Sequence, residues 1–228
     1  MCMPAIRRQT RAFVKRQVAR EFSHLSHAGL CIVGRNVLNP AAPSRGLPKV
    51  YRFGKNLVTF RVHELPPEDL HRLRAAEGWL ELGDSPEANA ELDNITPALR
   101  AHPAVLAVRW QIEAKAGRWD QAHEIARALT ELVPEECSVW VWRAYAVRRM
   151  AGGGIEQARE LLRGMVEKFP REWVLPYNLA CYACQLGHVE QARDWLQKAL
   201  ALGNARALKL MALEDPDLEP LWKDLGKP

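Results

Sequence analysis

The chain has 228 residues, of which 48% are hydrophobic, and a formal net charge of +5 at pH 7. No stretch approaches the roughly 18 consecutive apolar residues that a membrane-spanning helix needs, so we expect no transmembrane segment. The five cysteines are odd in number and scattered, which disfavours a disulfide framework and favours a reducing, cytoplasmic setting. The N-terminus lacks an apolar run followed by small residues, which disfavours a secretory signal.

The charge is divided unevenly along the chain. Residues 1–63 contain 12 of the 32 Lys and Arg residues and one of the 27 acidic residues, Glu21, for a net charge of +11. Residues 64–228 contain the other 20 bases and 26 acids, for a net charge of −6, and all eight tryptophans. Such a shift in composition marks a boundary between differently built segments. We therefore predict a basic, poorly ordered segment at 1–63 and a folded domain at 64–228.

The basic segment has two parts. Residues 9–27 have the spacing of a basic amphipathic helix, and residues 37–56, rich in Pro, Gly and Arg, are typical of a loop or of disorder. A disordered tail or a start codon assigned too far upstream is the simpler interpretation. An arm attracted to nucleic acid or an anionic membrane and an organellar presequence stay open. Because no Met lies between Met3 and Met150, a start near the domain would need a non-standard codon.

From residue 68 onward, a helix–glycine–helix outline occurs four times. In each unit a glycine precedes an alanine by five residues, and the alanines are spaced by 34, 36 and 34 residues. A glycine accepts the left-handed conformation that ends a helix, and an alanine lets the second helix approach the first closely. The four pairs are Gly83 with Ala88, Gly117 with Ala122, Gly153 with Ala158, and Gly187 with Ala192.

Prolines and apolar spacing predict the helix bounds. Pro134 and Pro170 follow the second and third units, where a residue that cannot continue a helix separates neighbouring units. Pro97 is expected to end the second helix of the first unit early. A lone hairpin cannot bury the apolar stripe of its second helix, so we expect the units to stack in a row. In the third unit this stripe comprises Ile155, Ala158, Leu161, Leu162, Met165 and Val166.

Past residue 204 the repeat pattern changes. Residues 205–213 are typical of a further helix, and Asp215-Pro216-Asp217-Leu218 of a break followed by a new helix start. The exposed end of a solenoid needs a cover for its last hairpin. We therefore predict that residues 205–228 form a cap. Its apolar face comprises Leu218, Leu221, Trp222 and Leu225.

This outline resembles the tetratricopeptide repeat family over about residues 68–204. The fourth unit matches with Tyr177–Gly187 as first helix and turn and His188–Leu200 as second helix. The third unit matches at Trp142, Tyr145, Ala146, Gly153, Ala158, Leu162 and Pro170. The resemblance implies an all-α fold: an α-solenoid of about four tetratricopeptide-like helical hairpins with a C-terminal capping helix. It also implies a non-catalytic role as a protein–protein interaction scaffold.

In proteins of this family, peptides usually bind the concave surface formed by the first helix of each hairpin. Chaperone-binding members hold a C-terminal carboxylate with a Lys/Asn/Arg set, of which this chain matches only Asn178, so that ligand is disfavoured. The resemblance implies a groove for a peptide or partner helix lined by Glu77, Glu81, Gln111, Lys115, Trp140, Arg143, Val147, Tyr177, Asn178, Cys181 and Gln185.

Cys181-x-x-Cys184 is the pair most suggestive of metal or redox chemistry. A structural zinc site needs four ligands, and the sequence has no second CxxC motif. We therefore interpret both cysteines as small packing residues. Because no catalytic, cofactor or metal constellation is recognisable, we predict that the protein is not an enzyme and uses no cofactor.

The expected ligand is a protein or peptide of unknown identity, and the oligomeric state stays open. RNA binding through the basic N-terminal arm is the alternative, because pentatricopeptide arrays share the helical-hairpin plan and bind RNA. The negative net charge of residues 64–228 disfavours nucleic acid, since contacts to phosphates demand a basic surface.

Overall fold

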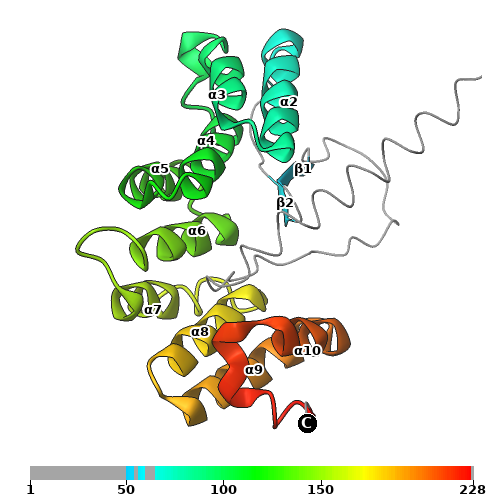
Figure 1. The fold of residues 1–228 in the computed structure, drawn as a ribbon, viewed down its shortest axis with the longest axis vertical. Coiled ribbons are helices and arrows are strands. Elements are labelled where there is room, and N and C mark those ends of the chain that lie inside the picture. Colours follow the sequence, from blue (N-terminus) through cyan, green and yellow to red (C-terminus); the bar gives the residue numbers. More distant parts are fainter. Residues whose placement is uncertain (1–49, 54–55, 60–64, 227–228) are drawn as a thin grey trace, which may run out of the picture.

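The computed structural model of the chain describes residues 50–53, 56–59 and 65–226. Over 65–226 the helices pack as successive antiparallel pairs that stack into an arc (Figure 1). The pairs are α2 (Pro67–Leu82) with α3 (Ser85–Asp93), α4 (Pro103–Lys115) with α5 (Trp119–Leu132), α6 (Cys137–Val147) with α7 (Ile155–Arg163), and α8 (Val174–Gln185) with α9 (Val189–Leu202). The predicted α-solenoid of four hairpins is confirmed.

The repeating alanines lie where the two helices of each hairpin meet. Ala88, Ala122, Ala158 and Ala192 are all fully buried, as the spacing predicts. Larger side chains of the same helices fill the space between hairpins, so that the arc has two apolar cores. One core joins the first three hairpins, and the other joins the third hairpin to the C-terminal end.

The turn of the third hairpin differs from the prediction by one residue. Here Gly152, with a φ of +72°, takes the left-handed conformation expected of Gly153. Gly153 is needed for another reason, because a Cβ atom on it would lie 2.0 Å from the carbonyl oxygen of Val147. The connection from α6 to α7 therefore requires two neighbouring glycines, one for its dihedral angle and one for close approach.

Two helices of the second-helix layer are shorter than the others. As Pro97 predicts, α3 ends at Asp93, and a 3-10 turn, η1 (Pro97–Leu99), follows. The buried carboxylate of Asp69 holds this turn against α2, accepting hydrogen bonds from the Thr96 amide (2.8 Å) and hydroxyl (3.0 Å). In the third hairpin α7 ends at Arg163, so the last part of its predicted apolar stripe, Met165 and Val166, lies in turns instead of a helix.

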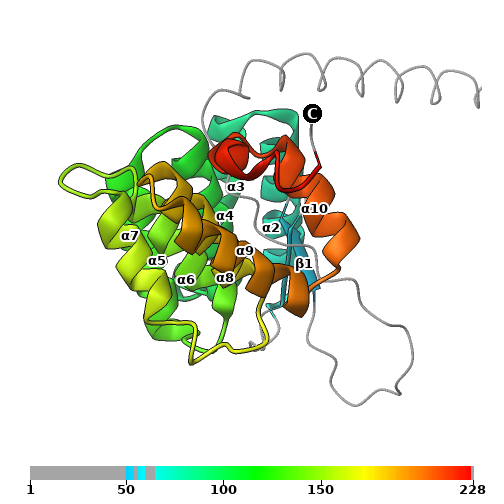
Figure 2. The same cartoon turned by 90° about the horizontal axis from the view of Figure 1, so that it is seen from below.

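The predicted cap consists of α10 (Ala205–Glu214) and a 3-10 helix, η2 (Pro216–Leu221). Figure 2 looks onto this end of the molecule, with α9, α10 and η2 nearest the viewer. Leu218 and Leu221 are buried, and the Trp222 indole donates a hydrogen bond to the Ala212 carbonyl at 2.8 Å. α10 packs on α9, whereas η2 turns back and packs on α8.

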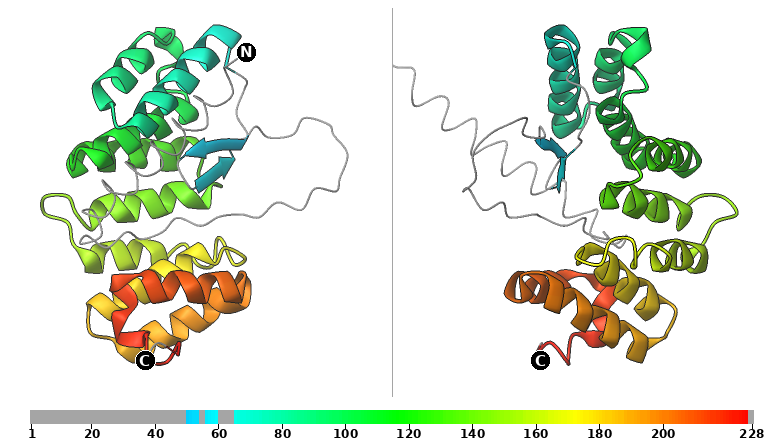
Figure 3. Two further views of the ribbon diagram at one scale, coloured as in Figure 1. Left: turned by 45° about the vertical axis from the view of Figure 1, so that its right-hand side comes forward. Right: turned by 180° about the vertical axis from the view of Figure 1, so that it is seen from behind.

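N-terminal to the helices, β1 (Val50–Phe53) pairs antiparallel with β2 (Asn56–Thr59), Val50 opposite Thr59. The pair lies on the concave side of the arc (Figure 3). The prediction of a loop over 37–56 is therefore wrong for its described part. Several β-branched and aromatic residues, Val50, Tyr51 and Phe53 before Gly54 and Val58 and Thr59 after it, favour a hairpin and outweigh the Pro- and Gly-rich composition upstream.

The predicted amphipathic helix at 9–27 lies outside the described residues. Among the helices that the structure does describe, none combines the length and apolar character that crossing a membrane requires.

Candidate functional site

The first helices of the hairpins, α2, α4, α6 and α8, form the inner side of the arc, and the second helices form the outer side (Figures 1 and 3). The predicted groove residues follow the repeat along these inner helices. Glu77, Gln111, Val147 and Cys181 hold one equivalent position in the four units, spaced by 34, 36 and 34 residues like the alanines. Their surroundings nevertheless differ from unit to unit.

The first two units bring opposite charges together on the inner side. The ammonium of Lys115 on α4 donates a hydrogen bond to the carbonyl of Leu80 on α2, with Nζ and O 2.5 Å apart. Burial lowers the pKa of Lys115, and the nearby charge of Glu81 acts in the opposite direction. Burial raises the pKa of Glu77 to about 7, an effect that Arg74 opposes and Glu81 reinforces. The carboxyl of Glu77 is therefore partly protonated and partly ionised near neutral pH.

Three predicted groove residues have buried polar atoms that lack a hydrogen-bond partner among the described residues: Glu77 Oε1, Gln111 Nε2 and Arg143 Nε. Each such atom costs about 1–3 kcal/mol of folding free energy, because it loses water and gains no protein partner. Buried polar atoms without partners are rare in folded proteins. The atoms of Glu77 and Gln111, on two successive inner helices, are the feature of this surface that most resembles a binding site, whereas Arg143 reaches toward α5.

The third unit contributes less open surface than predicted. Val147 is only 6% exposed and packs in the core, so it does not line a groove. Trp140 is half-buried; its indole donates to the carbonyl of Pro134 at 3.0 Å, and the Lys168 ammonium lies 5.1 Å from its ring centre. The guanidinium of Arg143 reaches toward α5 and lies 3.4 Å from the Thr130 hydroxyl.

The fourth unit corrects the prediction most clearly. Tyr177, Asn178 and Cys181 are all 0% exposed, so none belongs to an open groove, and only Gln185 is exposed. Residues 215–221 contact Tyr177 and Cys181, and we call them the return segment because they fold back from α10 onto α8.

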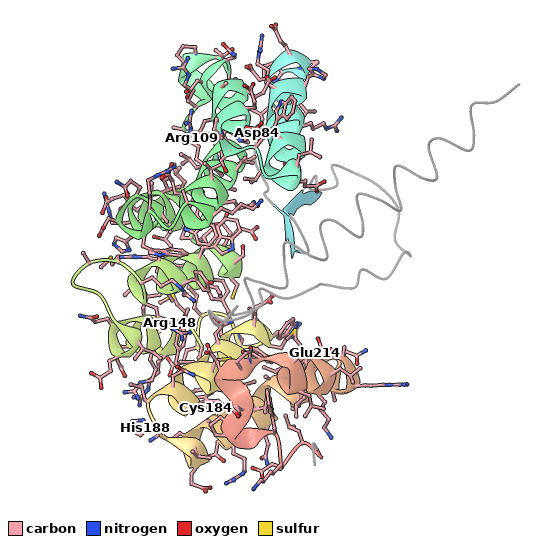
Figure 4. All side chains as sticks on the ribbon, viewed as in Figure 1. Asp84, Arg109, Arg148, Cys184, His188 and Glu214 are labelled. Carbon is pink, nitrogen blue, oxygen red and sulfur yellow. The ribbon has the colours of Figure 1, made fainter. Side chains whose placement is uncertain are left out.

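Two buried aspartates attach the return segment to the inner helices. Asp215 accepts hydrogen bonds from the Tyr177 hydroxyl (3.2 Å) and the Cys181 thiol (3.6 Å), both at Oδ2. Asp217 accepts one from the guanidinium of Arg148 at 2.7 Å. Figure 4 places Arg148 at the junction of the third and fourth hairpins. Sequence analysis missed this contact, because the cap contains several charged residues and nothing in its sequence distinguishes the two buried aspartates from the exposed charges.

The same aspartates and a thiol raise the question of a metal site. Cys181, Asp215 and Asp217 each have one ligand atom within 4.8 Å of the others, and all three are buried. However, the Asp215 oxygens already accept hydrogen bonds from Tyr177, from Cys181 and from the Asp217 amide. The positive Arg148 guanidinium adjoins Asp217, and a cation placed there would be repelled by it. The arrangement fits an ion-paired joint between helices better than a cation site.

Both cysteines of the CxxC pair are buried free thiols, which agrees with their interpretation as packing residues. Burial raises the pKa of Cys184 to about 11, and the negative charges of Asp217 and Asp215 add to the effect. A thiol of this kind is protonated at neutral pH and is a poor nucleophile and a poor metal ligand.

An aromatic cluster joins the second and third units. Trp110 stacks on Trp142 with ring centres 5.0 Å apart, and Tyr145 contacts Trp110 and Trp119 edge-on. The guanidinium of Arg149 lies 3.6 Å from the centre of the Tyr145 ring. Trp142 is only 2% exposed and belongs to the core.

No protein-family model matches the chain, and no curated protein matches it in sequence. Among solved structures, the chain is similar to TTC0263, a thermophilic TPR protein of Thermus thermophilus, with 22% identity and a TM-score of 0.53 over 69% of this chain and 83% of that one. It is also similar to the structure MamA MSR-1 C2, with 18% identity and a TM-score of 0.46 over 69% of this chain and 94% of that one. The first similarity confirms the tetratricopeptide fold of the helical region.

Proposed function

We propose that the protein is a non-catalytic interaction scaffold that captures an extended peptide or a partner helix on the inner side of α2, α4 and α6. The buried polar atoms of Glu77 and Gln111, which lack partners among the described residues and belong to the inner helices α2 and α4, are the observation that supports it most. The groove that we propose extends from Glu81 and Lys115 to Trp140 and leaves out the covered part of α8.

A peptide backbone has the groups that this surface lacks. Its N–H groups donate to a carboxylate such as Glu77, and its carbonyls accept from an amide such as Gln111. These atoms are buried in the free protein, so a peptide reaches them only when the two side chains turn toward it, and each atom that then gains a partner recovers about 1–3 kcal/mol. Because the surface carries both positive and negative side chains, we expect it to recognise the backbone and shape of a peptide and not its net charge.

Selection from a displayed library of random 12-residue peptides on the full chain tests the proposal. Peptides that enrich on the wild type are then measured by fluorescence anisotropy with Gln111→Ala and with Gln197→Ala, a matched control at an exposed position of α9. We expect Gln111→Ala to weaken binding about ten-fold, which corresponds to one lost hydrogen bond of about 1.4 kcal/mol, and Gln197→Ala to leave it unchanged. Equal affinity for all three chains would contradict the proposed groove. RNA binding in place of peptide binding, weakened by added salt, would favour the alternative function.

We further propose that residues 64–228, including the cap at 205–228, form one domain, and that residues 1–63 are a separate basic segment. Mass spectrometry of the natively expressed protein tests this division. Peptides from residues 1–57 would rule out a start codon assigned too far upstream, and rapid proteolysis confined to this segment would support a separate tail.

A cytoplasmic setting is also part of the proposal. It is supported by the free thiols of Cys137, Cys181 and Cys184, which a reducing compartment maintains. Fractionation of the native cells checks it, and recovery of the protein in an oxidising compartment would contradict it.

A further inference from the structure

The inner side of α8 is a binding surface that is already occupied. All eleven residues from Val174 to Cys184 are buried, whereas α4 keeps Lys115 exposed and Gln111 half-buried on its inner side. Cys181 holds in the fourth unit the position that Gln111 holds in the second. The return segment, residues 215–221, thus lies where the fourth unit would contribute to the groove.

The contacts of the return segment resemble those of a bound peptide. The carboxylate of Asp215 is held by the Tyr177 hydroxyl and the Cys181 thiol, and that of Asp217 by the Arg148 guanidinium. Leu218, the next residue, is fully buried in the core that includes α8. The surface therefore has two carboxylate sites, for residues two positions apart, followed by an apolar site.

We infer that the inner side of the fourth unit recognises acidic peptides of the pattern Asp-x-Asp-aliphatic, and that residues 215–218 of this chain occupy the site until a partner with the same pattern displaces them. The inference rests on the proposed scaffold function and adds to it the chemistry of one partner. It also implies that binding is regulated, because the partner competes with residues 215–218 of the chain itself.

Several features make the return segment displaceable. It is a single short 3-10 helix with Pro216 at its start and Pro220 inside it. Hydrogen bonds in a 3-10 helix are weaker than those of an α-helix, and each proline removes one donor. Burial raises the pKa of Asp215 to about 6, because the ionised carboxylate is less stable in its buried position than in water. A peptide in trans can make the same contacts, but it loses translational and rotational freedom on binding, so it displaces the return segment only when present in excess.

The test uses the full chain and a labelled synthetic peptide with the sequence of Glu214 to Trp222. In the variant Asp217→Asn the return segment loses its charge contact with Arg148, and circular dichroism reports whether the helices are kept. We expect the peptide to bind this variant about ten-fold tighter or more than the wild type, because a larger fraction of sites is open. Adding Arg148→Gln should abolish that binding, and a peptide with both aspartates replaced by asparagine should not bind.

Hydrogen exchange on the wild-type chain gives a second measurement that does not depend on the folding of a variant. Excess unlabelled peptide should speed exchange in residues 215–221 while α8 stays protected. A scrambled peptide of the same composition should change nothing. No binding to a helical Asp217→Asn chain, or binding that is indifferent to Arg148→Gln, would overturn the inference, and so would unchanged exchange in the return segment.

The two proposals fail separately. Binding of the acidic peptide should be insensitive to Gln111→Ala, because Gln111 lies two units away from the return segment. If the library selects no peptide sensitive to Gln111→Ala while the acidic peptide still depends on Arg148, the groove on α2 to α6 fails and the site of the fourth unit stands.

Discussion

Glu77 lets a single substitution test the electrostatics of the inner surface. Its carboxylate lies on α2 with Oε1 buried and lacking a hydrogen-bond partner among the described residues, and its pKa is raised from 4.5 to about 7. A glutamine has the same shape and no charge. We therefore expect Glu77→Gln to stabilise the protein where the native carboxyl is ionised.

The magnitude follows from the change in pKa. A rise from 4.5 to about 7 corresponds to about 3 kcal/mol, at about 1.36 kcal/mol for each tenfold change in proton affinity, and partial exposure of the side chain reduces this to about 1–2 kcal/mol. For an acid whose folded pKa is raised, the folded state binds more protons, so stability falls as the pH rises from 4.5 to about 7. The variant lacks this fall. The free energy of unfolding of Glu77→Gln should therefore equal that of the wild type at about pH 4 and exceed it by about 1–2 kcal/mol at about pH 8.

Urea unfolding of the wild type and of Glu77→Gln at pH 4 and pH 8 measures the difference. The matched control is Glu135→Gln, which removes an exposed carboxylate from the connection between α5 and α6 and should change stability by less than about 0.5 kcal/mol at either pH. Equal free energies of unfolding for the wild type and Glu77→Gln at pH 8 would refute the reasoning, because they would mean that the Glu77 carboxylate is solvated as well in the folded protein as in the unfolded chain.

Three further predictions concern packing. Ala192→Leu should overpack the fourth hairpin and destabilise it by about 1–3 kcal/mol, and an unchanged thermal midpoint would mean that α8 and α9 do not meet there. Gly153→Ala should lower the thermal midpoint because its Cβ would collide with the Val147 carbonyl, whereas Gly164→Ala, whose Cβ would make only ordinary contacts, should be within about 0.5 kcal/mol of the wild type. Native alkylation of Cys184 at pH 8, read by mass spectrometry, should be much slower than in urea, since its pKa is about 11; equal rates would contradict its burial.

The helical hairpins were predictable from the amino-acid sequence alone, because the interactions that form them are local. The glycine that ends a first helix and the alanine five residues later act within one unit, and Ala88, Ala122, Ala158 and Ala192 are all buried where the spacing places them. The end of α3 before Pro97 was also predictable, since a proline limits the helix within a few residues of itself. The assignment of the first helices to the inner side came from the resemblance to the tetratricopeptide repeat family.

Which part of the inner surface is open depends on contacts between distant segments. The contact between Tyr177 and Asp215 joins residues 38 positions apart, and that between Arg148 and Asp217 joins residues 69 apart. No periodic pattern predicts such pairs, because the return segment occurs once and lies outside the repeat. The repeat therefore predicted equivalent surroundings for Gln111 and Cys181, whereas the fold leaves one half-buried and covers the other completely. Local spacing determines on which face of its helix a side chain lies. The position of distant segments determines whether that face is exposed to solvent or buried by protein.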